Sequence, residues 1–313
     1  REGFERAVAP LLPVDESAWR YQTRGLPFVW SRVRAAGGRT LLWGGWCARL
    51  EAQNLSDARA FGAPWPVAAA DLDYHYQAVE TLLGVREIPL DPCFEAITRK
   101  LGLEVRPKAA ATGPCGCRAW VSTDLHKRAR LQPNAVALRV LLGPTGRAEG
   151  IEYLDTSTGK TEAARARRVV LCASPIETAR LLLLTAPGGP AGANGRGGRV
   201  LTDHLGASDL VIIPRPAPAP GVAGPLERAA WVPRFVNLGR KRRRDYRGGF
   251  TVEVRGPTAL DTLGAEALRA LEVDPLEAPA LSYFQVHAIG ESAPNSRRFV
   301  ELDPSAKDQF GRP

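Results

Sequence analysis

The sequence predicts a mixed α/β fold, and three segments support this prediction. Residues 135–142 alternate between apolar and polar, which is typical of a half-buried strand. The apolar run at 168–172 is typical of a buried strand, and it leads directly into a helix after Ser174. From Asp71 onwards, apolar residues recur three and four positions apart, as they do in an amphipathic helix.

Glycines mark the ends of two predicted helices. The helix that begins at Asp71 is expected to stop at Gly84, and a second helix over 91–101 is expected to stop at Gly102. Both glycines are suited to the left-handed conformation that commonly terminates a helix.

Strand 135–142 is the first of three in a predicted β-meander. A turn at 143–146 leads to a second strand at 151–154, and a turn at 157–160 leads on to the third, 168–172. The third strand is expected to enter a parallel-type sheet, because its apolar run is continuous.

The helix after the third strand carries a predicted capping box. Ser174 is expected to be the N-cap, Pro175 to occupy the first turn, and Glu177 to complete the box. Ala173 and Ser174 are small, so a ligand can approach the backbone where the strand ends.

Composition excludes several classes of protein. Of the 313 residues, 44% are hydrophobic and 24% are charged, and no apolar run is long enough to cross a membrane. The five cysteines contain no C-x-x-C pair, so they suggest neither a disulfide framework nor a zinc ribbon. Cys115, Cys117 and His126 lack a fourth ligand, and no metal site is expected.

The net charge of +9 includes a basic run at 240–244. This run offers contacts to nucleic acid as one interpretation. Tyr246 is the single aromatic residue beside it, so no stacking platform accompanies the charge. A solvated loop is the favoured interpretation, and nucleic acid is not the expected partner.

A glycine-rich segment is the sharpest local signal in the chain. Two glycine pairs flank a hydroxyl residue and an aromatic residue: Gly37, Gly38, Thr40, Trp43, Gly44 and Gly45. Main-chain groups left uncovered in this way can cradle phosphates or lie against a flat ring system. Structural turns in a tryptophan-rich region are the alternative, and the residues alone favour ligand binding only slightly.

Segment 37–45 resembles the flavin-contacting segment of the glucose-methanol-choline (GMC) oxidoreductases. The resemblance is closest to the branch that contains pyranose oxidases and gluconate-type dehydrogenases. Further segments resemble the same family in the expected order: 65–85, 169–184, 198–204 and 294–302. The match therefore extends over nearly the whole chain.

The resemblance implies that the chain binds FAD. It places these residues around the cofactor: Gly37, Gly38, Thr40, Trp43, Gly44, Gly45, Ala137, Cys172, Ala173 and Ser174. The main chain of Ala137 matches the position that pairs with the adenine. Leu42 stands where pyranose oxidases carry the histidine that bonds to the flavin, so the FAD is expected to be non-covalent.

The resemblance also implies two partial domains. Residues 1–207 match an FAD-binding domain without its first Gly-x-Gly-x-x-Gly strand, and residues 208–313 match a substrate-binding domain built on an antiparallel sheet. The catalytic histidine, with its histidine or asparagine partner, is expected beyond Pro313, so no catalytic residue is named. His75 and His204 are expected to be structural, and His287 is the candidate to face a substrate.

The activity implied is oxidation of the CH–OH groups of alcohols, with hydride transfer to flavin. Sugars or polyols are the expected substrates, while oxygen, a quinone and a cytochrome all stay open as electron acceptors. The chain by itself is expected to be inactive. An inactive fragment of such an enzyme, or a basic nucleic-acid-binding module, are the alternatives.

Overall fold

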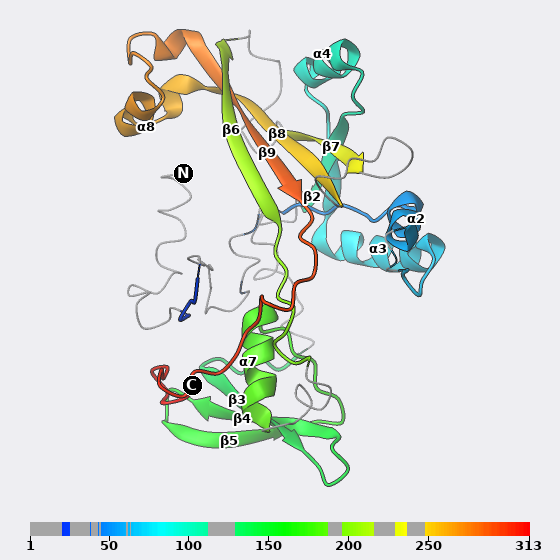
Figure 1. The fold of residues 1–313 in the computed structure, drawn as a ribbon, viewed down its shortest axis with the longest axis vertical. Helices are drawn as coiled ribbons and strands as arrows, with labels where there is room; N and C mark the ends of the chain where they lie inside the picture. The colour runs from blue at the N-terminus through cyan, green and yellow to red at the C-terminus, as the bar shows by residue number, and fades with distance from the viewer. Residues whose placement is uncertain are drawn as a thin grey trace. The chain divides into compact units, whose positions relative to one another are not determined.

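The computed structural model describes residues 21–25, 38, 43, 45–60, 62, 64–111, 129–186, 196–215, 229–236 and 248–313. The chain forms two units, and each is built from separate segments of sequence (Figure 1). Unit 1 comprises Arg1–Gly38, Thr123–Thr202 and Pro294–Pro313, and unit 2 comprises Arg39–Ser122 and Asp203–Ala293. The functional division at 207/208 stays a prediction.

Unit 1 contains a three-stranded antiparallel sheet with one long helix against it. The strands follow the order β3 (Ala135–Leu142), β4 (Ala148–Asp155) and β5 (Lys160–Arg165). Helix α7 (Pro175–Thr185) packs on β3 and is tied to it by the Val140 amide, which donates to Thr185 Oγ1 at 3.0 Å. The first two strands of the predicted meander are thus confirmed, and β3 has the predicted limits.

The third strand lies earlier in the chain than predicted. Residues 168–172 form no strand, and Val170 is 81% exposed. The strand that pairs with β4 is instead the polar segment Lys160–Arg165, in which every residue is exposed. The prediction of a parallel-type strand here was wrong, because a buried apolar strand needs neighbours and all strand pairs in the described residues are antiparallel.

Two family-like segments far apart in sequence meet in unit 1. Arg199 forms a β-bridge with Phe299, and the Leu201 amide donates to the Arg298 carbonyl at 2.9 Å. The Arg199 guanidinium also lies 4.5 Å from the centre of the Phe299 ring. These contacts hold the last segment of unit 1 against the chain that leaves α7.

Unit 2 is built on a six-stranded antiparallel sheet, with strand order β1-β2-β7-β8-β9-β6. Its strands are β1 (Val85–Ile88), β2 (Arg106–Ala111), β6 (Leu205–Pro214), β7 (Ala229–Val236), β8 (Gly249–Ala259) and β9 (Leu281–Gly290). Its helices are α2 (Ala52–Ala60), α3 (Ala69–Leu83), α4 (Pro92–Leu101) and α8 (Ala265–Ala270), with short 3₁₀ turns η5 (Leu260–Thr262) and η6 (Ala278–Ala280). The predicted fold class, mixed α/β with a three-stranded sheet and a larger antiparallel sheet, is confirmed, although β1 and β2 of the larger sheet come before residue 208.

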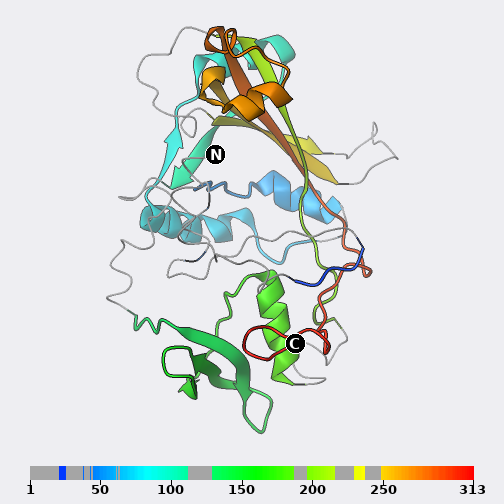
Figure 2. The same cartoon turned by 90° about the vertical axis from the view of Figure 1, so that its left-hand side faces the viewer.

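The two faces of this sheet are covered differently. On one face, Phe94 of α4 packs with Ala230 and Phe284 in an apolar cluster. On the other face, Ile212 and Tyr283 pack beneath a second cluster. The buried members of that cluster are Leu260, Leu268 and Ala278. Figure 2 shows α8 at one end of the long strands, with α2 and α3 at the other end.

Both helices predicted near the start of unit 2 are confirmed. Gly84 ends α3 in the left-handed conformation, at φ 61°, and Gly102 has φ 64° after α4. At the start of α4, the Asp91 carboxylate accepts from the Cys93 amide at 3.0 Å. No helix in the described parts of the chain is long and apolar enough to span a membrane.

Candidate functional site

The start of α7 has a strained backbone. Ser174 has φ 72° and ψ 159°, a region that is essentially reserved for glycine and costs about 1–3 kcal/mol for other residues. Its side-chain oxygen is buried and has no hydrogen-bond partner in the described structure. Strain and an unsatisfied hydroxyl at the same residue are typical of a functional position.

The predicted capping box at α7 is wrong, although Pro175 does occupy the first turn. The Ser174 side chain makes no capping bond, because its positive φ carries the hydroxyl away from the helix amides. Glu177 is engaged elsewhere: it accepts from the Tyr21 hydroxyl at 2.8 Å and from Arg180 Nη1 at 3.4 Å. Before the helix, Cys172 and Ala173 are exposed.

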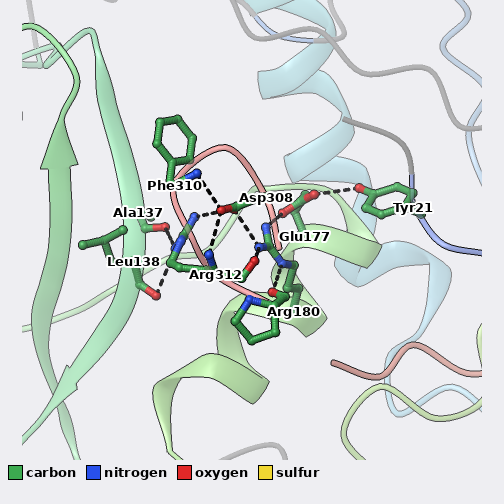
Figure 3. A network of polar contacts seen from close by, with 9 residues as sticks. Tyr21, Ala137, Leu138, Glu177, Arg180, Asp308, Phe310 and Arg312 are labelled. Carbon is green, nitrogen blue, oxygen red and sulfur yellow. Dashed lines mark hydrogen bonds and ion pairs between the residues drawn. The ribbon is translucent and has the colours of Figure 1, made fainter. Parts of the chain in front are cut away.

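A charged network joins α7 to the last segment of unit 1 (Figure 3). Arg180 Nη2 donates to Asp308 Oδ2 at 2.7 Å, and Arg180 Nε donates to the main-chain oxygen of Pro313 at 2.8 Å. Arg312 Nη2 also donates to Asp308 Oδ2, at 3.3 Å. The other carboxylate oxygen, Oδ1, accepts from the amides of Phe310 and Arg312, so Asp308 organises its own loop.

This network shifts the pKa of two of its members. Burial by itself would raise the pKa of Asp308, but the hydrogen bonds from Arg180 and from the loop amides outweigh it and lower the pKa. Burial, with the neighbouring Arg180 cation, lowers the pKa of the Arg312 guanidinium. At neutral pH the loop therefore carries an ionised Asp308 between two arginines.

Arg312 also reaches the position predicted to pair with adenine. Its Nη1 donates to the Ala137 carbonyl at 3.0 Å and to the Leu138 carbonyl at 3.4 Å (Figure 3). The register of β3 against β4 shifts between Ala137 and Arg139, as it does at a β-bulge. Sequence reasoning identified Ala137 but did not identify the guanidinium that binds it.

In unit 2, residues 45–47, at the end of the glycine-rich segment, pair with β2 through an isolated β-bridge. Trp46 forms an antiparallel bridge with Ala110. The Cys47 amide donates to the Ala109 carbonyl at 3.0 Å, and the Ala111 amide donates to the Gly45 carbonyl at 2.8 Å. Burial raises the pKa of the Cys47 thiol, which stays protonated and lies 3.4 Å from the Gly45 oxygen as a donor.

A buried ion pair lies beneath this segment. Lys108 Nζ is 3.0 Å from Glu253 Oε1, and both side chains are only 5% exposed. The Lys108 ammonium lies 2.9 Å from the centre of the Trp46 ring, and Arg255 also donates to Glu253. Trp46 Nε1 is buried and has no acceptor in the described structure, so an indole donor is left unsatisfied there.

The ion pair belongs to a polar row across the sheet. Cross-strand partners share a face, and the strand registers place five residues side by side in the order Arg106, Trp231, Glu253, His287 and Ser208. His287 Nδ1 is 2.5 Å from Ser208 Oγ. In the described structure no carboxylate bonds the His287 ring, and Glu253 is held by Lys108 and Arg255, so this pair lacks the orienting acid of a hydrolase triad.

The predicted cofactor positions divide between the two units. Gly38, Ala137, Cys172, Ala173 and Ser174 lie in unit 1, and Trp43 and Gly45 lie in unit 2. Gly37, Thr40 and Gly44 lie outside the described residues, as do Leu42, the basic run 240–244, Cys115, Cys117 and His126. No cluster of metal-binding side chains occurs among the residues that are described. His75 and His204 are exposed.

Comparison with known proteins gives one informative similarity. No family model matches the chain. The chain is 25% identical to a 2-methyl-1,2-propanediol dehydrogenase from Mycolicibacterium austroafricanum, over 96% of this chain and 64% of that protein. The chain therefore spans just under two thirds of the length of this relative, and the similarity extends through both of its units.

Proposed function

We propose that the chain is part of an FAD-dependent oxidoreductase of the GMC type, which oxidises the CH–OH group of an alcohol. The observation that carries the proposal is the similarity over 96% of the chain to a dehydrogenase named for a diol. That name favours small diols or polyols, beside sugars, as substrates. The ordered series of flavin-family segments in the sequence supports FAD as the cofactor.

Each unit by itself contains groups whose chemistry suits a part of a flavin nucleotide. A Cβ built at Gly38 meets no atom within 4 Å, so no side chain fills the space beside this glycine. Trp46 Nε1, next to Gly45, and Ser174 Oγ, at the start of α7, are buried polar atoms without partners in the described structure. Donors of this kind suit the carbonyl and phosphate oxygens of FAD.

Each of these groups has a role in holding the cofactor under this proposal. In unit 1, Gly38 would hold it through uncovered main chain and Ser174 through its hydroxyl. In unit 2, Trp43 would contact it through its aromatic ring and Gly45 through its backbone. When bound, FAD would supply a ring system that accepts a hydride from the alcohol carbon.

The direct test uses the intact protein encoded by the gene, purified and incubated with FAD. We expect the retained cofactor to show the absorbance of oxidised flavin, and this absorbance to be bleached anaerobically by 1,2-diols or sugars. Failure to retain FAD after reconstitution would reject the proposal. Bleaching by none of the alcohols, with FAD retained, would reject the substrate class but not the cofactor.

A matched pair of variants tests the glycine-rich segment. Gly38 has φ 52° and Gly159, in the β4–β5 turn, has φ 73°, and neither has an atom within 4 Å of a built Cβ. Asparagine tolerates such φ values, so both substitutions carry similar backbone strain. Gly38→Asn is expected to weaken FAD binding about tenfold or more. Gly159→Asn is expected to leave it unchanged, and equal effects would contradict the assignment.

A further inference from the structure

Lys108 and Glu253 form the most deeply buried charged contact in the described structure. The residues are 4% exposed, and they join β2 to β8 across 145 positions of sequence. Removing two charges from water is costly, and such a pair adds little stability compared with two apolar side chains. What a buried pair supplies is fixed geometry, because each charge must stay next to its partner.

This ion pair positions the Trp46 ring. Lys108 and Ala110 are two residues apart on β2, so their side chains share a face, and Trp46 lies opposite Ala110 on that face. The ring therefore covers the ammonium group in a cation–π contact, with Nζ 2.9 Å from the ring centre. If the Lys108 ammonium moved away, the Trp46 ring would lose this cation–π contact.

Within the described residues 45–47, main-chain contacts with β2 accompany the ring. Two hydrogen bonds, from the Cys47 amide and from the Ala111 amide, join segment 45–47 to β2. Two hydrogen bonds hold such a segment only weakly, since each contributes about 1 kcal/mol net to the stability of the folded state. Further along the chain, Arg49 pairs with Glu80 and the Leu50 amide donates to the Tyr76 hydroxyl, which anchors the chain to α3. The contact with Lys108 is the one by which the Trp46 side chain holds residues 45–47 to the sheet itself.

We propose that Lys108 and Glu253 are positioning residues, which fix the glycine-rich segment at Gly45 against the six-stranded sheet through Trp46. This deepens and rests on the proposed function, since Gly45 is a proposed flavin contact. Arg255 supports the arrangement by donating to the same Glu253 carboxylate. The ion pair acts on the cofactor through the backbone it orders.

The first experiment needs no cofactor. Lys108→Met removes the charge and keeps the length of the side chain, and Glu253 retains Arg255 as a cationic partner, so the sheet is expected to fold. Hydrogen exchange should become at least about tenfold faster at the Cys47 and Ala111 amides and stay unchanged in β8 and β9. Lys108→Arg, which preserves the charge, should restore most of the protection.

Two results would overturn the proposal. One is unchanged exchange at Cys47 and Ala111 in Lys108→Met, and the other is an equal rise across the whole sheet, which indicates a general loss of stability. Should Lys108→Met fail to fold, Trp46→Leu leaves the ion pair in place and must release the same two amides. Arg165→Met, which breaks an exposed pair with Glu149 in unit 1, is the control and should change neither amide.

The second experiment measures the FAD dissociation constant of the intact protein by fluorescence titration. Lys108→Met is expected to raise it about tenfold, and Lys108→Arg to return it towards the wild-type value. A wild-type protein that binds no FAD would reject the proposed function, while the exchange experiment would still decide the positioning role. An unchanged dissociation constant together with released amides would show that Gly45 is not a flavin contact.

Discussion

Gly198 holds one of the closest backbone contacts in unit 1. It has φ 71°, and a Cβ built there would clash with the Val300 carbonyl oxygen. The Val300 amide donates to the Gly198 carbonyl at 2.6 Å, so the two segments cannot separate without losing this bond. Only glycine fits at position 198, because another residue would be strained at this φ and its Cβ would clash with Val300.

Gly198→Ala is therefore expected to lower the free energy of unfolding by about 2–4 kcal/mol, through strain and overpacking together. Urea denaturation followed by circular dichroism measures the change. Gly159→Ala is the control, since its φ of 73° gives similar strain with no neighbouring atom, and it should cost only about 1 kcal/mol. Equal midpoints for the two variants would show that the contact with Val300 is not tight.

Replacing Ser174, in contrast to Gly198, should stabilise the protein. Its backbone conformation suits glycine, and its buried hydroxyl lacks a partner in the described structure. Ser174→Gly should raise the free energy of unfolding by about 1 kcal/mol, since relief of strain exceeds the added entropy of the unfolded chain. A melting experiment on the cofactor-free protein checks the sign, and a loss of stability would refute the strain.

At the scale of elements, Arg180 of α7 is joined to the last segment of unit 1 through Asp308 and through main-chain oxygens of Arg312 and Pro313. The Asp308 side chain is 15% exposed and bonds Arg180, Arg312 and two loop amides. Asp308→Asn is expected to cost about 1–3 kcal/mol of unfolding free energy, because two half-buried arginines lose their shared anion. Asp303→Asn, at an exposed turn bonded to Ser305, should cost less. Chemical denaturation of both variants distinguishes these outcomes.

The lowered pKa of Asp308 gives this junction a dependence on pH. A carboxyl with a depressed folded-state pKa contributes stability above its unfolded pKa, near about 4, and loses it as pH falls through the folded value. The wild-type urea midpoint should therefore fall more steeply than that of Asp308→Asn below about pH 4. Parallel curves for the two proteins would mean that the neighbours of Asp308 do not lower its pKa in the folded state.

The elements that sequence predicts well are those that carry local signals. Asp91, Gly84 and Gly102 sit at helix ends and satisfy backbone groups within a few residues, so α3 and α4 were predicted nearly to their limits. Strand β5 has no apolar pattern, since every residue is exposed, and it exists because β4 offers it a partner. Sequence periodicity cannot detect a strand of this kind.

In the candidate site too, residues with local signals were predicted and residues paired over long distances were not. Ala137 was predicted from the family resemblance and Ser174 also from the turn at the start of the helix, and each has an unusual environment in the structure. Their contact with a cofactor stays a prediction. The Lys108–Glu253 pair was not predicted, because the two residues are 145 positions apart and come together only through the order of the strands in the sheet. No local motif marks such a pair. Asp308 was not predicted either, because its arginine partner Arg180 lies 128 residues away in the sequence.

On the scale of the whole molecule, the stability of the backbone is expected to be uneven. Strand β8 lies between β7 and β9, and Glu253 in its middle is buried. Both apolar clusters of unit 2 contact this sheet, through Val254 on one face and Tyr283 on the other. Strand β5 is at the edge of a three-stranded sheet and has no buried residue.

Amide exchange should therefore be slowest in β8 and β9 and fastest, among the strands, in β5. Opening β5 breaks one ladder and exposes little apolar surface, whereas opening β8 breaks two ladders and uncovers Val254. Mass spectrometry of exchanged peptides from the cofactor-free chain measures the order directly. Protection of β5 equal to that of β8 would mean that its outer edge is covered by another part of the protein, and the exposed edge would then be a docking surface within the intact molecule. Rapid exchange in β8 would instead contradict the continuous six-stranded sheet that supports Lys108 and Trp46.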